Sequence, residues 1–177
     1  VQGLGMTMNE TLQAVVQSLQ ERFQAQPSEF RGEVSLLIAP EFNLEVALAL
    51  RDEFQFEMLL DETAVDYWPQ TAPRFHVVAH MYSFTRNAVI ELRFPVDGNA
   101  AELRSLVPVY PNANWKEREI WDLFGIRFDG HPDPRRIVMP YEWEGHPLRK
   151  DYPLGYEEVQ FSFNADQVDR HKRYAKR

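Results

Sequence analysis

The spacing of apolar residues in the first part of the chain predicts two helices and two extended segments. Between residues 9 and 26, apolar side chains recur every three or four residues and Pro27 follows, so an amphipathic helix is expected. Its apolar face consists of Leu12, Val15, Val16, Leu19 and Phe23. Residues 33–40 (EVSLLIAP) are typical of a strand, residues 41–54 of a second helix, and residues 56–68 of an extended segment.

Two runs rich in β-branched and aromatic residues follow, and together they predict a hairpin. RFHVVAHMYSF ends at residue 84 and AVIELRFPV begins at residue 88, which leaves a short turn between them. A further short helix is expected over residues 99–106, covering one face of the sheet. This order of elements predicts an α+β fold, with a mostly antiparallel sheet and helices packed on it.

The segment WKEREIWDLFGIRF, residues 115–128, predicts a helix with two different faces. Asn114 is expected to be the N-cap, and Glu117 three residues later completes a capping box. At 100° per residue, large apolar side chains share one arc and mostly charged ones the opposite arc. Gly125 should end the helix in a left-handed turn, so the residues after it are expected to run extended.

Composition and charge exclude several classes of protein. The chain carries 27 acidic against 19 basic residues, and this net charge of -8 argues against a general nucleic-acid binder. The excess lies in residues 1–62, which hold three Lys/Arg against eleven Asp/Glu. There is no cysteine to form a disulfide or to ligate an iron–sulfur cluster. No apolar run approaches a membrane span and no signal peptide is recognisable, so we expect a soluble, cytosolic chain.

Glu117 is the one residue in the two-faced helix that suggests an active site, because it falls on the apolar arc. A buried carboxylate needs a partner or a raised pKa, and a general acid or base would use the raised pKa. The favoured interpretation is structural: a capping partner, or an ion pair with Arg135 or Arg136. Arg118, Glu119 and Asp122 are expected to be salt-bridge residues of an exposed or interface face.

A short repeat, FDGHP at 128–132 and WEGHP at 143–147, places two histidines fifteen residues apart. Each Gly-His-Pro is typical of a tight turn in which the imidazole bonds nearby backbone, and the spacing matches no common zinc pattern. His76 and His80 lie in a predicted strand, about 13 Å apart, which is too far to share an ion. A small metal-dependent hydrolase remains an alternative of another class, and its candidate residues are Glu117, His131, Asp133 and His146.

The segment 128–163 is rich in aromatic residues, prolines and glycines, a composition that suits neither a long helix nor a solvated linker. We expect it to run extended over a surface, with another subunit favoured and its own domain as the alternative. The expected division is a disordered start at 1–8, an α+β domain at 9–125 and an extended partner-binding tail at 126–177.

EREIWDLFGIRFDGHPDPRRI, followed by MPYEWEGHPLRKDYPLG, resembles the family of the 30 kDa subunit (the C subunit) of respiratory complex I, the proton-pumping NADH:quinone oxidoreductase. The resemblance covers about residues 114–155. The matching signature positions are Glu117, Arg118, Glu119, Asp122, Leu123, Phe124, His131, Arg135 and Ile137. Components of photosynthetic ferredoxin:plastoquinone complexes and of membrane-bound hydrogenases are also similar, and the full string GHPLRKDYP favours the respiratory type.

The resemblance implies a non-catalytic structural and assembly subunit of the hydrophilic arm. FMN, iron–sulfur clusters and quinone would belong to partner subunits, with no catalytic, cofactor or metal site in this chain. Its partners would be the large D subunit (49 kDa type) and neighbouring cluster-bearing subunits, on the cytoplasmic side of a bacterial plasma membrane. The predicted partner-binding and signature residues are Glu117, Arg118, Glu119, Trp121, Asp122, Phe124, His131, Arg135, Arg136, Trp143, His146, Arg149, Lys150, Asp151 and Tyr152.

Overall fold

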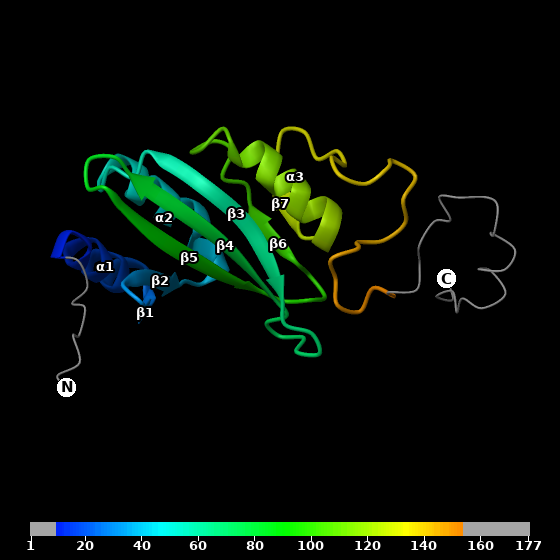
Figure 1. The fold of residues 1–177 in the computed structure, drawn as a ribbon, viewed down its shortest axis with the longest axis horizontal. Coiled ribbons are helices and arrows are strands. Elements are labelled where there is room, and N and C mark those ends of the chain that lie inside the picture. Colours follow the sequence, from blue (N-terminus) through cyan, green and yellow to red (C-terminus); the bar gives the residue numbers. More distant parts are fainter. Residues whose placement is uncertain (1–9, 154–177) are drawn as a thin grey trace, which may run out of the picture.

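A five-stranded sheet lies at the centre of the computed structural model, which describes residues 10–153 (Figure 1). In chain order its strands are β1 (Gln26–Phe30), β2 (Glu33–Leu37), β3 (Met58–Asp66), β4 (Phe75–Ser83) and β5 (Ala88–Val96). Their spatial order is β1-β2-β5-β4-β3, and only the β2–β5 pairing is parallel. The predicted α+β class with a mostly antiparallel sheet is confirmed, whereas the predicted disordered start lies outside the described residues.

Two helices supply much of the apolar core that packs on this sheet. They are α1 (Glu10–Phe23) and α2 (Asn43–Asp52), the second preceded by a 3-10 turn, η1 (Pro40–Phe42). The predicted apolar face of the first helix, from Leu12 to Phe23, is buried, as are Val46 and Leu50 of α2. These side chains join sheet residues such as Leu92 in one hydrophobic cluster, and each large one contributes about 1.5–3 kcal/mol by leaving water. Both predicted helices are confirmed.

The predicted hairpin is the β4–β5 pair, which is in continuous register from Phe75–Val96 to Ser83–Ala88. Its loop covers residues 84–87, and Asn87 has a left-handed φ of 48°. Asn and Asp accept this conformation more readily than most residues. The Tyr82 hydroxyl donates a hydrogen bond of 2.7 Å to Oδ1 of Asn87, which fixes the end of the turn.

Two elements differ from the sequence expectation. β1 was not predicted, because it contains Pro27 and all five of its residues are exposed, so it lacks the alternation of a half-buried strand. Residues 99–106 do not form a helix. Instead β6 (Glu102–Arg104) pairs in parallel with β7 (Arg127–Asp129), and the Ser105 N–H donates to the Asp129 carbonyl at 2.8 Å. A partner strand distant in sequence here outweighs local helix propensity.

The two-faced helix is α3 (Ala113–Phe124), which packs along β3. Asn114 is not its N-cap, so that prediction is wrong. The helix begins after Asn112, whose amide donates 2.7 Å to the Leu59 carbonyl rather than capping the helix. Gly125 ends α3 with φ 73°, and β7 follows, so the predicted left-handed turn and extended exit are both confirmed.

Residues 130–153, called the strap below, run from β7 past the C-terminal end of α3 and back toward the ends of β3 and β4 (Figure 1). Their backbone bonds this chain's own domain: the Leu148 N–H donates to the Leu123 carbonyl at 3.0 Å. The Lys150 N–H donates to Asp66 Oδ2 at 2.8 Å. The alternative expectation, a segment laid over its own domain, therefore describes the strap, and the expected boundary after residue 125 falls just before β7. The tail from residue 154 onward lies outside the described residues.

Candidate interaction site on α3 and the strap

Asp122 is the centre of the contact between α3 and the strap. Its side chain is fully buried, and Oδ2 accepts backbone N–H groups of Ile137 (3.0 Å), Val138 (2.8 Å) and Met139 (2.9 Å). Oδ1 accepts Nη1 of Arg136 at 2.5 Å. Burial raises the pKa of Asp122, but these donors outweigh burial and hold that pKa below its usual value. The expected ion pair is therefore present, with Arg136, but Asp122 is buried rather than exposed and also accepts backbone N–H groups of the strap.

Arg118 forms a second contact one helical turn earlier. Nε donates to the Arg135 carbonyl at 3.0 Å and Nη2 to the Arg136 carbonyl at 3.3 Å. The guanidinium also lies over the ring of Trp115, 5.3 Å from its centroid. Arg118 is buried, so its charge is directed at strap carbonyls and at Asp133, 3.8 Å away. The expected ion pair is therefore present, with Asp133, but Arg118 is buried against the strap rather than exposed.

A third contact joins the far end of the strap to the ends of β3 and β4. Arg74 is buried and binds two carboxylates at once: Asp66 through Nη2 at 2.8 Å, and Asp151 through Nη2 at 2.6 Å. Burial raises the pKa of Asp66, yet Arg74 and the N–H groups of Lys150 and Trp68 lower it to about 2. Paired guanidinium and carboxylate groups of this kind form strong, directional bonds.

The sequence did not predict a role for Asp66 or Arg74, because both lie outside residues 114–155, which carry the family resemblance. A signal was present, however. One residue ends a predicted strand, the other begins the next, and their opposite charges flank the same loop. Antiparallel neighbours bring such positions together.

The two histidines of the Gly-His-Pro repeat bond to backbone, as predicted for tight turns. His131 Nε2 donates to the Asn114 carbonyl at 3.1 Å, and its Nδ1 accepts the Asp133 N–H at 3.0 Å. His146 Nδ1 donates to the Asp122 carbonyl at 2.9 Å. Within residues 10–153, no group of three or more His, Asp or Glu side chains is placed to hold a metal ion.

Gly125 permits the close approach of His146. A Cβ at this position would lie 2.5 Å from His146 Nε2, and the φ of 73° independently favours glycine. Gly145 is related: its φ is 90° and a Cβ would lie 2.8 Å from Cε2 of Tyr152. Glycine at these two positions thus lets His146 pack on the end of α3 and lets Tyr152 pack against Gly145 within the strap.

Glu117 is buried as the helical arc predicted, but its partners differ from those expected. The Ser105 hydroxyl donates to Oε2 at 2.7 Å and the Leu106 N–H donates to Oε1 at 2.5 Å. Burial raises the pKa of Glu117 to about 7, against the lowering effect of these two bonds. Both structural interpretations, a capping box and an ion pair with Arg135 or Arg136, are wrong. Those arginines bind Asp133 and Asp122 instead.

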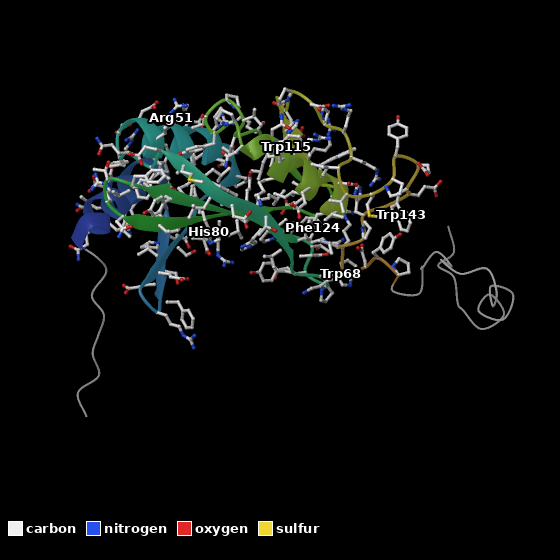
Figure 2. All side chains as sticks on the ribbon, turned by 45° about the horizontal axis from the view of Figure 1, so that its top comes forward. Arg51, Trp68, His80, Trp115, Phe124 and Trp143 are labelled. Atoms are coloured by element: carbon white, nitrogen blue, oxygen red, sulfur yellow. The ribbon has the colours of Figure 1, made fainter. Side chains whose placement is uncertain are left out.

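The remaining signature residues divide into buried and accessible ones. Phe124, predicted to anchor a partner, is instead buried in its own core, with its ring edge toward Phe75 at 6.5 Å between centroids. Arg149 Nε donates to the Phe124 carbonyl at 2.6 Å. Figure 2 shows Phe124 turned toward the sheet and Trp143 out on the strap beyond α3. The accessible and partly accessible ones are Glu119, Trp121, Arg135, Trp143, Lys150 and Tyr152.

Large apolar side chains are exposed on α3 and on the strap. Tyr141 is 90% exposed, Trp115 61%, Val138 56% and Leu148 51%. These four residues are called the outer surface below. Large aromatic and aliphatic groups left accessible in this way are typical of surfaces that meet a partner.

The fold and the site together define an α+β domain that uses buried charges to fasten its own C-terminal strap and leaves apolar side chains outside it. No helix within residues 10–153 is long and apolar enough to cross a bilayer. The chain belongs to the family described as "Respiratory-chain NADH dehydrogenase, 30 Kd subunit", whose sequence model matches residues 36–158. The resemblance drawn from the α3 and strap motifs is thereby confirmed.

Curated relatives agree with this membership. The chain is 49% identical over 151 residues to the C subunit of the NADH-quinone oxidoreductase of Roseiflexus sp. (strain RS-1), covering 84% of this chain and 86% of that protein. It is 41% identical over 150 residues to the protein of the same name from Geobacter sulfurreducens, covering 83% and 92%.

Solved structures share the fold. A trypsin-resistant fragment (1-134) of Nqo5 superposes with a TM-score of 0.62 at 27% identity, covering 70% of this chain and 98% of that one. A chain of the membrane-bound sulfane sulfur reductase, an archaeal respiratory membrane complex, gives a TM-score of 0.63 at 22% identity, covering 82% and 87%. The second likeness shows the fold alone.

Proposed function

We propose that this chain is a non-catalytic structural and assembly subunit in the hydrophilic arm of a membrane-bound NADH:quinone oxidoreductase. It would lie on the cytoplasmic side of a bacterial plasma membrane and reach the membrane only through the complex. FMN, iron–sulfur clusters and quinone would be held by partner subunits. Family membership supports a place in the complex, and the absence of cysteine supports clusters held elsewhere.

The observation that carries the structural role is how the buried charges of the domain are used. Asp122 and Arg118 bind strap backbone, and Arg74 binds Asp66 and Asp151. This arrangement fixes the strap, and with it the outer surface, before any partner arrives. A preorganised surface loses less conformational entropy on binding. We assign the outer surface to the large D subunit (49 kDa type), the partner that the family resemblance implies.

Glu117, the one candidate acid, supports a non-catalytic role for α3. A general acid or base must come within hydrogen-bond reach of its substrate. Each Glu117 oxygen already accepts a hydrogen bond from the chain, and the side chain has no exposed surface.

The test is purification of the tagged chain from gently solubilised native membranes. Co-purifying subunits are identified by mass spectrometry, and the same fraction is assayed for NADH:quinone reduction. We expect the large subunit, flavin- and cluster-bearing subunits, and activity. A different electron-donor module would keep the family but overturn the NADH-linked assignment. A chain that comes through alone would overturn the subunit role.

A matched pair of variants separates the outer surface from general surface effects. Tyr141→Ser combined with Leu148→Ser removes two exposed apolar groups of the outer surface and is expected to lower recovery of the large subunit at least several-fold. Phe30→Ser removes an exposed ring (69%) from β1, which lies at the opposite edge of the sheet from β3, and should leave recovery unchanged. Equal recovery from the double variant and from wild type would contradict the assignment.

A further inference from the structure

Two carboxylic acids are buried in the contact between β3 and α3, inside the domain and away from the outer surface. Glu62 comes from the strand and Glu117 from the helix, and both are essentially inaccessible. Their sequence neighbours fasten the same two elements: Lys116 Nζ lies 2.6 Å from Asp61 Oδ1. α3 packs along β3, this ion pair joins the residues next to the two glutamates, and the charge of Glu117 acts on Glu62 across the contact.

The two acids have unequal surroundings. Glu117 accepts one hydrogen bond on each oxygen, from Ser105 and from the Leu106 N–H. Glu62 Oε2 is buried and has no hydrogen-bond partner among the described residues. A buried anionic oxygen without a donor is costly, whereas a protonated one loses the charge and gains a hydrogen to donate.

No cation from the described elements packed around this pair offsets it. Asp61 adds negative charge beside Glu62, and the nearby Lys116 is committed to Asp61. His131 Nε2 lies 3.9 Å from Glu117 Oε2, but the two ring nitrogens bond the Asn114 carbonyl and the Asp133 N–H.

Two arginines lie near the pair, and both point their charges elsewhere. Arg118 is held by strap carbonyls and by Asp133. Arg127 is largely exposed, with Glu102 as its ion-pair partner at 4.0 Å.

We propose that Glu62 and Glu117 form a proton-binding site between β3 and α3, in which Glu62 keeps its proton at neutral pH and Glu117 exchanges one with solvent. Glu117 has no exposed surface of its own but borders a pocket of about 270 Å³, whose lining also includes Arg118, Phe128 and His131, and this pocket is the proposed exchange route. Glu117 of α3 lines this pocket, whereas Glu62 of β3 is not among its lining residues.

The direction of both pKa shifts agrees with this geometry. Burial raises the pKa of Glu62 well above its usual value, and the charges of Glu117 and Asp61 raise it further. Burial raises the pKa of Glu117 to about 7. Because both groups are protonated more readily in the folded chain than in the unfolded one, folding takes up protons. The stabilisation from the pair is complete below the unfolded pKa and declines as pH rises through neutrality.

The direct test is infrared spectroscopy of the full-length chain in ²H₂O at pH 7. Wild type is expected to show the C=O stretch of a protonated carboxylic acid, and Glu62→Gln to lose most of it. Glu119→Gln, an exposed change on the same helix, should retain the band. Absence of the band in wild type at pH 7 would overturn the proposal.

A second measurement distinguishes proton binding from a merely structural role. Chemical denaturation at several pH values should show wild type losing stability relative to Glu62→Gln as pH rises from about 5 to about 8. A role in packing alone would shift the two curves by a constant amount, and parallel curves would therefore overturn the site. Family membership and the subunit role are unaffected by either result.

Discussion

The sheet body and the strap are held by different forces, although they share one chain. The body buries apolar side chains from α1, α2 and the strands β2 to β5 in one cluster. No strap residue is fully buried, yet the strap is bound by four buried charged residues of the domain: Asp66, Arg74, Arg118 and Asp122. Apolar burial is non-directional, while these bonds require fixed donors and acceptors. The apolar cluster should therefore tolerate changes of pH, and the charged contacts that bind the strap should respond to them.

The largest expected effect is on the body. Phe94→Ala removes a fully buried ring from β5, and truncations of this kind cost about 3–5 kcal/mol of unfolding free energy. Denaturant unfolding followed by circular dichroism measures the loss. Phe30→Ala, at an exposed position in β1, should stay within about 0.5 kcal/mol of wild type. Similar losses for both variants would show that apolar burial is not what stabilises the sheet body.

Asp122→Ala should detach the strap while leaving the body folded. The change leaves three backbone N–H groups and Arg136 without their acceptor, and breaking a buried pair of this kind costs about 3–5 kcal/mol. Hydrogen exchange should accelerate at residues 137–139 and remain slow in β4 and β5. Glu119→Ala, exposed on the same helix, is the control. Simultaneous acceleration in the sheet would mean that strap and body unfold as one unit, which removes the distinction.

Acid should weaken the strap's third contact. The pKa of Asp66 is about 2 when folded, against 3.8 as the ordinary value, so its contribution is present above about pH 4 and lost as pH falls toward 2. The difference corresponds to about 2 kcal/mol. Denaturation of wild type and Asp66→Asn between pH 5 and pH 2 measures it, since the variant should lose this part of the pH dependence. This pH dependence has the opposite sign to that of the Glu62–Glu117 pair. If the stability of wild type and of Asp66→Asn changed equally with pH, the assignment would be contradicted.

Two glycines give the smallest and most local comparison. Gly125→Ala and Gly130→Ala both place a side chain at positive φ (73° and 77°), which costs about 1–2 kcal/mol each. Only the first also meets a neighbour, His146, at 2.5 Å, whereas nothing lies within 4 Å of a Cβ at the second. Thermal unfolding should therefore rank Gly125→Ala as less stable than Gly130→Ala. The reverse order would show that His146 does not pack on the helix end as described.

The sequence predicts those parts of the fold whose pattern is local. α1, α2, the β4–β5 hairpin and the glycine end of α3 follow from periodicity and turn chemistry within a few residues. β1 and β6 do not, because each is specified by pairing with another strand rather than by its own residues. The same limit applies to the site. Asp122 and Arg118 belong to the family signature, which is visible in the sequence. Whether their charges face solvent or the strap backbone depends on where the strap, many residues later, folds back.

Tyr141 offers the most direct test of the central claim, that the fastened strap presents the outer surface to the large subunit. A photo-crosslinking amino acid at position 141, in the chain expressed in its native cell, reports what lies against this side chain within the assembled complex. We expect a crosslink to the large subunit, absent when the same probe replaces Phe30. A strong crosslink from position 30 with none from position 141 would contradict the claim, and would place the partner surface at the β1 edge of the sheet.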